Sequence, residues 1–177
     1  EGFWRSIWDY FSIQADGDPT QVLSTHKMPG AQWFPDTALN YAEHIFRNAT
    51  DQRPAIIARC EGSPPVEMSW QQLQRDVGAL AATLRGLGIE RGDRVVAYLS
   101  NVPQTVVAFL ACASIGAIWS SCAPEMGVSV VLDRFQQIAP KLIFATDSYT
   151  SAGKQFDRRE VLNAVLQGLP DIAKVIH

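Results

Sequence analysis

The pattern of apolar and polar positions switches twice between strand and helix within residues 92–124. Residues 94–99 form a Val-rich apolar run, which is typical of a strand covered on both faces. Apolar residues at helical spacing follow over 105–115, and Gly116 ends this helix because glycine adopts the left-handed conformation at little cost. A second apolar run, residues 117–122, predicts another buried strand. The order strand, helix, strand predicts two parallel strands joined by a crossover helix.

The same alternation continues to the end of the chain. The patterns predict helices over 128–138 and 158–166, strands over 141–145 and 172–176, and a polar loop over 147–156. Strands that alternate with helices indicate an α/β fold, with a mainly parallel sheet and helices on both of its faces.

A hairpin and a long helix are predicted upstream of the parallel unit. Residues 54–60 and 66–68 are short apolar runs separated by a turn rich in Gly and Pro, which favours a β-hairpin. Ser69 is followed three residues later by Gln72, the capping-box pattern at the start of a helix.

The first residues of the chain predict an amphipathic helix over 1–14. Phe3, Ile7 and Phe11 recur at a spacing of four and share one face, and Trp4 and Trp8 lie on its flank. We interpret this aromatic stripe as a docking face, because such stripes are more often packing surfaces than cofactor sites.

A loop follows over 16–32, and then a second helix whose cap is Asp36 or Thr37. The chain therefore divides into an N-terminal extension, residues 1–50, which we expect to pack on the main body, and an incomplete α/β subdomain, residues 51–177.

Composition narrows the function classes. The net charge of −3 provides no electrostatic case for binding nucleic acid or an anionic membrane. The apolar stretch 106–123 approaches the length of a membrane span, but serines and a glycine interrupt it. Cys60, Cys112 and Cys122 are odd in number and lack metal-ligand spacing, which favours free thiols, no metal site and a cytoplasmic location.

No residue stands out as catalytic. The segment Ser151-Ala152-Gly153-Lys154 lacks the upstream Gly and the following Ser or Thr of a P-loop, so a surface loop is the simpler interpretation, although Lys154 suits a phosphate. Glu125 follows the second strand, at the edge where ligands of open α/β sheets bind, but a simple helix-entry turn is favoured. His26, His44 and His177 have no evident Ser or Cys partner for catalysis, and Asp133 beside Arg134 is interpreted as a solvated or interface ion pair.

Several blocks of sequence together resemble the AMP-forming acyl-CoA synthetases of the adenylate-forming superfamily. They are SWQQL at residues 69–73, GIERGDRV at 88–95, YLSNVP at 98–103 and AFLACASIGA at 108–117. The segments MPGAQWFP at 28–35, LNYAE at 39–43, WSSCAP at 119–124, LDRF at 132–135 and GKQFD at 153–157 are similar to the acetoacetate-activating branch, a sister of the acetate branch.

This resemblance implies a ligase that uses ATP, CoA and Mg²⁺ to form an acyl-adenylate and then a thioester. It places the CoA nucleotide at Ser151, Ala152, Gly153 and Lys154, where Lys154 keeps the positive charge of a family arginine and Ser151 replaces another. The turn 123–125 also approaches CoA in the family, with Glu125 in place of a glycine.

The resemblance also implies that the phosphate loop, the ribose-binding Asp and the catalytic Lys lie downstream, so the ATP site is not among these residues. We therefore expect an N-terminal portion that is inactive alone, whose partners are small-molecule substrates and the rest of its own chain, with no nucleic acid or membrane. The alternatives are a stand-alone, non-catalytic binding module of the same fold, and a ligase for another short acid such as acetate or propionate.

Overall fold

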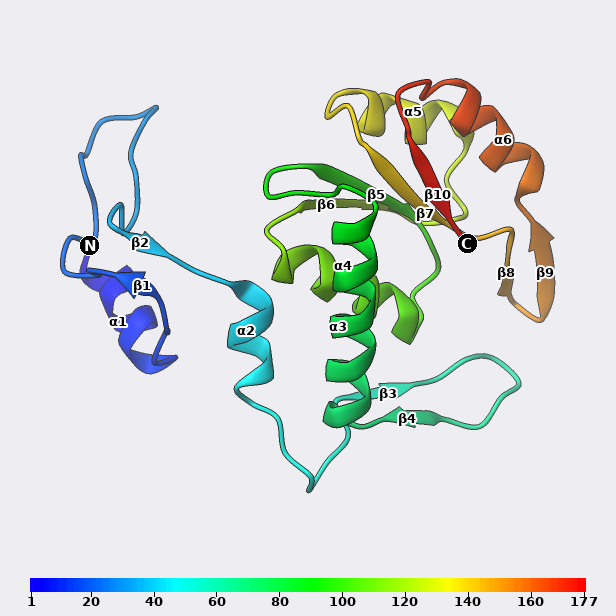
Figure 1. The fold of residues 1–177 in the computed structure, drawn as a ribbon. Coiled ribbons are helices and arrows are strands. Elements are labelled where there is room, and N and C mark those ends of the chain that lie inside the picture. Colours follow the sequence, from blue (N-terminus) through cyan, green and yellow to red (C-terminus); the bar gives the residue numbers. More distant parts are fainter. The chain divides into compact units, whose positions relative to one another are not determined.

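Four parallel strands form the central sheet, in the spatial order β10-β7-β5-β6 (Figure 1). They are β5 (Arg94–Tyr98), β6 (Ile118–Cys122), β7 (Leu142–Ala145) and β10 (Lys174–Ile176). The computed structural model describes all residues 1–177, which form two compact units, Glu1–Arg47 and Asn48–His177, and the sheet belongs to the second. Every pairing in it is parallel, so the predicted co-directional strands are confirmed.

Helices cover both faces of this sheet, as predicted. In Figure 1, α3 (Trp70–Gly86) and α4 (Pro103–Ser114) lie on one face, and α5 (Val128–Gln136) and α6 (Arg159–Gln167) on the other. Alternate strand residues point to opposite faces, so the side of α5 and α6 has its own apolar core. That core is built from Val96, Tyr98, Cys122, Val131, Phe135, Ile143, Ala145, Leu162, Val165 and Leu169.

Glycine and serine act at the helix ends largely as expected. Gly116 has φ of +74° and follows α4, so a left-handed residue ends this helix as predicted. The Ser69 Oγ accepts a hydrogen bond from the Gln72 N–H at 3.1 Å and caps α3. The other half of the capping box is absent, because the Gln72 Oε1 accepts from the Arg75 guanidinium at 2.7 Å and not from the Ser69 N–H.

The segment expected to be a polar loop is instead a β-hairpin. Strands β8 (Ser148–Ser151) and β9 (Lys154–Asp157) pair antiparallel, with Tyr149 opposite Phe156 and Ser151 opposite Lys154. Ala152 and Gly153 have φ of +50° and +71°, the combination that a two-residue type I′ turn requires. The upstream hairpin of β3 (Ile56–Ala58) and β4 (Val66–Met68) forms as predicted.

The first unit contains two short helices and a two-stranded ribbon. It comprises α1 (Gly2–Tyr10), β1 (Asp16–Gly17), β2 (Thr37–Ala38) and α2 (Tyr41–Phe46). The predicted cap of α2 was wrong: Thr37 lies in β2, and the Asn40 side chain accepts from the N–H groups of Ala42 and Glu43 at 3.1 and 3.2 Å. The predicted loop over 16–32 contains β1 at its start, because Asp16 and Gly17 pair with Ala38 and Thr37.

Within this unit, the tryptophans of α1 make the ring contacts. Trp8 lies 4.4 Å from the ring of Phe34 and Trp4 lies 5.6 Å from that of Trp33, measured between centroids. Phe3 and Phe11 of the predicted stripe are exposed and Ile7 is partly buried, so this stripe packs only in part within the unit.

None of the helices is both long enough and apolar enough to cross a membrane.

Candidate functional site

A cavity of about 560 Å³ lies where the central strands of the sheet end. It is lined by residues 99–101 after β5, Thr105 of α4, residues 121–125 at the end of β6, and residues 149–151 of β8. The carboxyl ends of parallel strands share one edge, and the loops that leave them diverge, which creates the opening. Two predicted site residues, Glu125 and Ser151, line this cavity.

Tyr98 holds one wall of the cavity, the turn after β6, in place. Its side chain is fully buried, and its hydroxyl lies 2.5 Å from the carbonyl oxygen of Pro124 and 2.9 Å from that of Met126. Burial raises the pKa of Tyr98, so the phenol keeps the proton that it donates to these carbonyls. The turn that carries Glu125 is thereby tied to the last residue of β5.

Arg158 joins this turn to the β8–β9 hairpin. Its Nη2 donates to the hydroxyl of Tyr149 at 3.0 Å and approaches the carbonyl oxygen of Glu125 at 3.5 Å. The guanidinium carbon lies 5.1 Å from the centroid of the Tyr149 ring, which stacks on Phe156 at 5.0 Å and 14°. The Nε of Arg158 is buried without a hydrogen-bond partner.

The other three predicted site residues form the turn of this hairpin and do not line the cavity. The N–H groups of Ala152 and Gly153 donate to the two carboxylate oxygens of Glu61, at 3.1 and 2.8 Å. Lys154 is exposed on the strand that leaves the turn. The turn therefore offers two backbone donors and one cation, and its donors already hold an anionic group.

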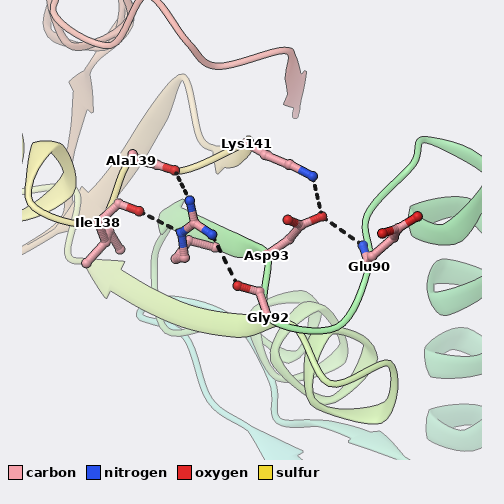
Figure 2. A network of polar contacts seen from close by, with 7 residues as sticks. Glu90, Gly92, Asp93, Ile138, Ala139 and Lys141 are labelled. Carbon is pink, nitrogen blue, oxygen red and sulfur yellow. Dashed lines mark hydrogen bonds and ion pairs between the residues drawn. The ribbon is translucent and has the colours of Figure 1, made fainter.

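The opposite edge of the sheet is closed by polar contacts. Figure 2 shows Asp93, which is buried just before β5, between the N–H of Glu90 and the Lys141 side chain. Asp93 Oδ2 accepts from Glu90 N at 2.9 Å and from Lys141 Nζ at 2.7 Å. The hydrogen bond from Lys141 is the main cause that lowers the pKa of Asp93 below its ordinary value.

Arg94 closes the same edge on its other side. Its guanidinium donates to the carbonyl oxygens of Ile138 at 2.7 Å, Ala139 at 3.0 Å and Gly92 at 3.2 Å. These contacts all join side chains to neighbouring loops, so we interpret this edge of the sheet as contributing to stability.

The expected ion pair of Asp133 and Arg134 is wrong, since no ion pair joins the two side chains of α5. No group of three or more His, Cys, Asp and Glu side chains lies close enough to hold a metal ion.

Comparison with known proteins assigns this architecture to a family. The model of the AMP-binding enzyme family matches residues 45–176, and that of the acetyl-coenzyme A synthetase N-terminus matches residues 1–45. The chain belongs to the AMP-binding enzyme family. The resemblance found in the sequence blocks is therefore confirmed.

Curated relatives of this AMP-binding enzyme chain carry a more specific name. It is 41% identical to acetoacetyl-CoA synthetase of Macaca fascicularis over 98% of its length, and 39% identical to that of Rhizobium meliloti (strain 1021) over 94%. A solved structure, acetoacetyl-CoA synthetase from Streptomyces lividans, is 45% identical and superposes with a TM-score of 0.94 over 99% of this chain. The chain spans 26% of the length of those two relatives and 27% of that structure.

Three contributors to the site of this AMP-binding enzyme chain were missed from sequence. Tyr149 and Arg158 were assigned to a loop and to a helix start, because the residues of the hairpin are mostly exposed and polar. An alternation of Tyr149 and Ser151 before the turn with Lys154 and Phe156 after it was the available signal. Glu61 lies 91 residues from the turn that it contacts, and nothing in local sequence announces such a pairing.

Proposed function

We propose that the complete protein is an AMP-forming ligase that joins acetoacetate to CoA. The acetoacetate carboxylate attacks the α-phosphorus of ATP and releases pyrophosphate, and the CoA thiol then attacks the acyl carbon and releases AMP. The observation that carries the proposal is the match to proteins named acetoacetyl-CoA synthetase over 98% of this chain in sequence and 99% in structure.

We propose that the part described here helps to hold the nucleotide of CoA at the carboxyl edge of the sheet. The candidate residues are Ser151, Ala152, Gly153 and Lys154, together with Glu125. The Glu61 carboxylate supports this assignment as a stand-in anion, because phosphate oxygens accept hydrogen bonds from convergent backbone N–H groups in the same way. Lys154 would add a point charge for a phosphate. Glu125 would contribute through its backbone, since its carboxylate repels an anion.

Mg²⁺ and ATP belong to the proposal for the complete protein, and the residues described here do not fit either of them. There is no acidic cluster for a metal ion and no glycine-rich phosphate loop after any strand. We therefore assign no step of adenylate formation to these residues.

Cytoplasm is the location that we propose. All three cysteines are free thiols, and Cys60 is exposed, which supports a reducing compartment.

The test is thioester formation by the complete protein with acetoacetate, acetate and propionate. We expect the highest kcat/KM with acetoacetate, and AMP and pyrophosphate as products. A preference for acetate or propionate would show that the acid substrate is not acetoacetate, while the assignment of a CoA ligase would stand. CoA binding without any thioester would favour the non-catalytic binding module.

A second measurement concerns residues 1–177 alone. We expect no ATP–pyrophosphate exchange with acetoacetate from this part, because it contains no phosphate loop. Exchange by this part would contradict the assignment of adenylate formation to other residues.

A further inference from the structure

The contact between Glu61 and the β8–β9 turn joins two hairpins that are far apart in the sequence. One carboxylate accepts from two consecutive backbone N–H groups, those of Ala152 and Gly153, over separations of 91 and 92 residues. In a two-residue turn these N–H groups point outward, where water would otherwise satisfy them. A charged acceptor makes the stronger hydrogen bonds here.

Glu61 is carried by a segment that can move at small cost. It lies in the connection between β3 and β4, residues 59–65, which are all exposed. A segment with few buried contacts opens more readily than the core, because little apolar surface is lost when it moves. The turn donors, in contrast, are held in place by the paired strands β8 and β9.

The charges around the turn set up a competition. Glu61 places a negative charge on the N–H groups next to Lys154, and it therefore reduces the attraction of this turn for any other anion. A phosphate that uses the same two donors must first displace the carboxylate. A site that is open for only a fraction of the time binds more weakly by that fraction.

We propose that Glu61 is an internal competitor that sets the affinity of the β8–β9 turn for the phosphate-bearing nucleotide of CoA. This inference rests on the proposed function and concerns the regulation of the same site. The carboxylate holds the turn when no nucleotide is present, and it leaves when a phosphate takes the two N–H groups. Glu61 is thus an affinity-determining residue and has no part in the chemical step.

The experiment measures equilibrium binding by calorimetry on the complete protein, with CoA and with dephospho-CoA, which lacks the 3′-phosphate, as probes. Glu61→Ala removes the competitor, and we expect CoA to bind on the order of fivefold more tightly, the gain expected if the turn is open about a fifth of the time. Glu61→Gln keeps an acceptor oxygen without the charge, so a smaller gain is expected. For dephospho-CoA the gain should be clearly smaller than for CoA.

The matched control is Glu67→Gln, which removes the same charge from an exposed position on the same hairpin. It should leave both dissociation constants unchanged. Equal tightening by Glu67→Gln would show that general charge, not the turn contact, is responsible, and would overturn the inference.

The opposite result for Glu61 would also overturn it. Weaker or unchanged CoA binding in Glu61→Ala means that the carboxylate braces the turn or does nothing to it. These outcomes differ from failure of the proposed function, in which the unsubstituted protein itself binds no CoA and forms no thioester.

Discussion

The two edges of the parallel sheet are built from the same strands and differ in how their polar groups are satisfied. At the amino edge, the Asp93 carboxylate bonds to Lys141, and the Arg94 guanidinium bonds to backbone carbonyl oxygens of the loop before β7 (Figure 2). At the carboxyl edge, the loops after β5 and β6 diverge around a cavity of about 560 Å³. There Arg158 Nε lacks a partner, and the turn donors are held by a carboxylate from an exposed segment.

This contrast predicts that stability and ligand binding depend on different edges of the same sheet. Internal partners that satisfy every polar group make an edge rigid, and leave it nothing to offer a ligand. Backbone donors that are held by a group on an exposed segment stay available to a ligand that displaces that group. Variants at the amino edge should therefore change the free energy of unfolding, and variants at the carboxyl edge should change affinity.

The largest effect is expected for Asp93→Ala at the amino edge. It leaves the N–H of Glu90 without its acceptor and frees Lys141, so the free energy of unfolding should fall by about 2 kcal/mol. Lys141 is half-exposed, so most of this loss comes from the hydrogen bond to Glu90 and not from the ion pair. Urea unfolding measures this loss, with Asp133→Ala, at an exposed position of α5, as the control. The CoA dissociation constant should not change.

Lys154→Ala tests the carboxyl edge. In the complete protein we expect the KM for CoA to rise about tenfold, while ATP–pyrophosphate exchange with acetoacetate stays nearly intact. Lys174→Ala, an exposed lysine at the start of β10, is the matched control and should change neither. Equal losses in both half-reactions would reject a role of Lys154 in holding CoA.

Tyr98→Phe tests both properties at once, because the ring of Tyr98 lies in the core and its hydroxyl bonds to the turn that forms the cavity wall. Loss of its hydroxyl removes the donor to Pro124 and Met126 and should lower the free energy of unfolding by about 1 kcal/mol. Unlike Asp93→Ala, it should also weaken CoA binding, since it frees the turn of Glu125. Tyr10→Phe, at a position 81% exposed in the first unit, should do neither.

The smallest effect is the pH dependence of the amino edge. The pKa of Asp93 in the folded protein lies below its ordinary value of 3.8, so the carboxylate contributes stability above pH 3.8. That contribution disappears as the pH falls below 3.8 and through the lowered pKa. The difference in unfolding free energy between the unsubstituted protein and Asp93→Asn should therefore narrow between pH 5 and pH 3. A constant difference would exclude Asp93 as the titrating group.

Local pattern predicted the elements of the sheet because burial dictates their period. The Val-rich run before Tyr98 matched only a buried strand, and the apolar face that ends at Gly116 matched only a helix. The spatial order β10-β7-β5-β6 could not be predicted, since it depends on pairings between distant segments. The cap at Asn40 was missed because a short strand takes up Thr37, the residue that local preference favours as the cap.

The candidate site was predicted partly from position along the strands and partly from the family resemblance. Glu125 follows β6, which the pattern had located, whereas Ser151 was named by the resemblance alone, and both line the cavity. The hairpin at residues 148–157 was missed because its side chains are mostly exposed, so no apolar alternation marks its strands. The acceptor on its turn was missed because Glu61 comes from another hairpin, and only the folded chain brings the two together.

The two ends of the β8–β9 hairpin lie next to each other where the hairpin joins the rest of the second unit. The N–H of Arg158 donates to the carbonyl oxygen of Asp147 at 2.6 Å, so both ends of the hairpin are fixed at neighbouring points. Insertions or deletions within residues 148–157 should therefore leave the pairing of β7 with β10 unchanged. Exchange of the whole hairpin should therefore alter the proposed nucleotide contact and leave the pairing of the sheet intact.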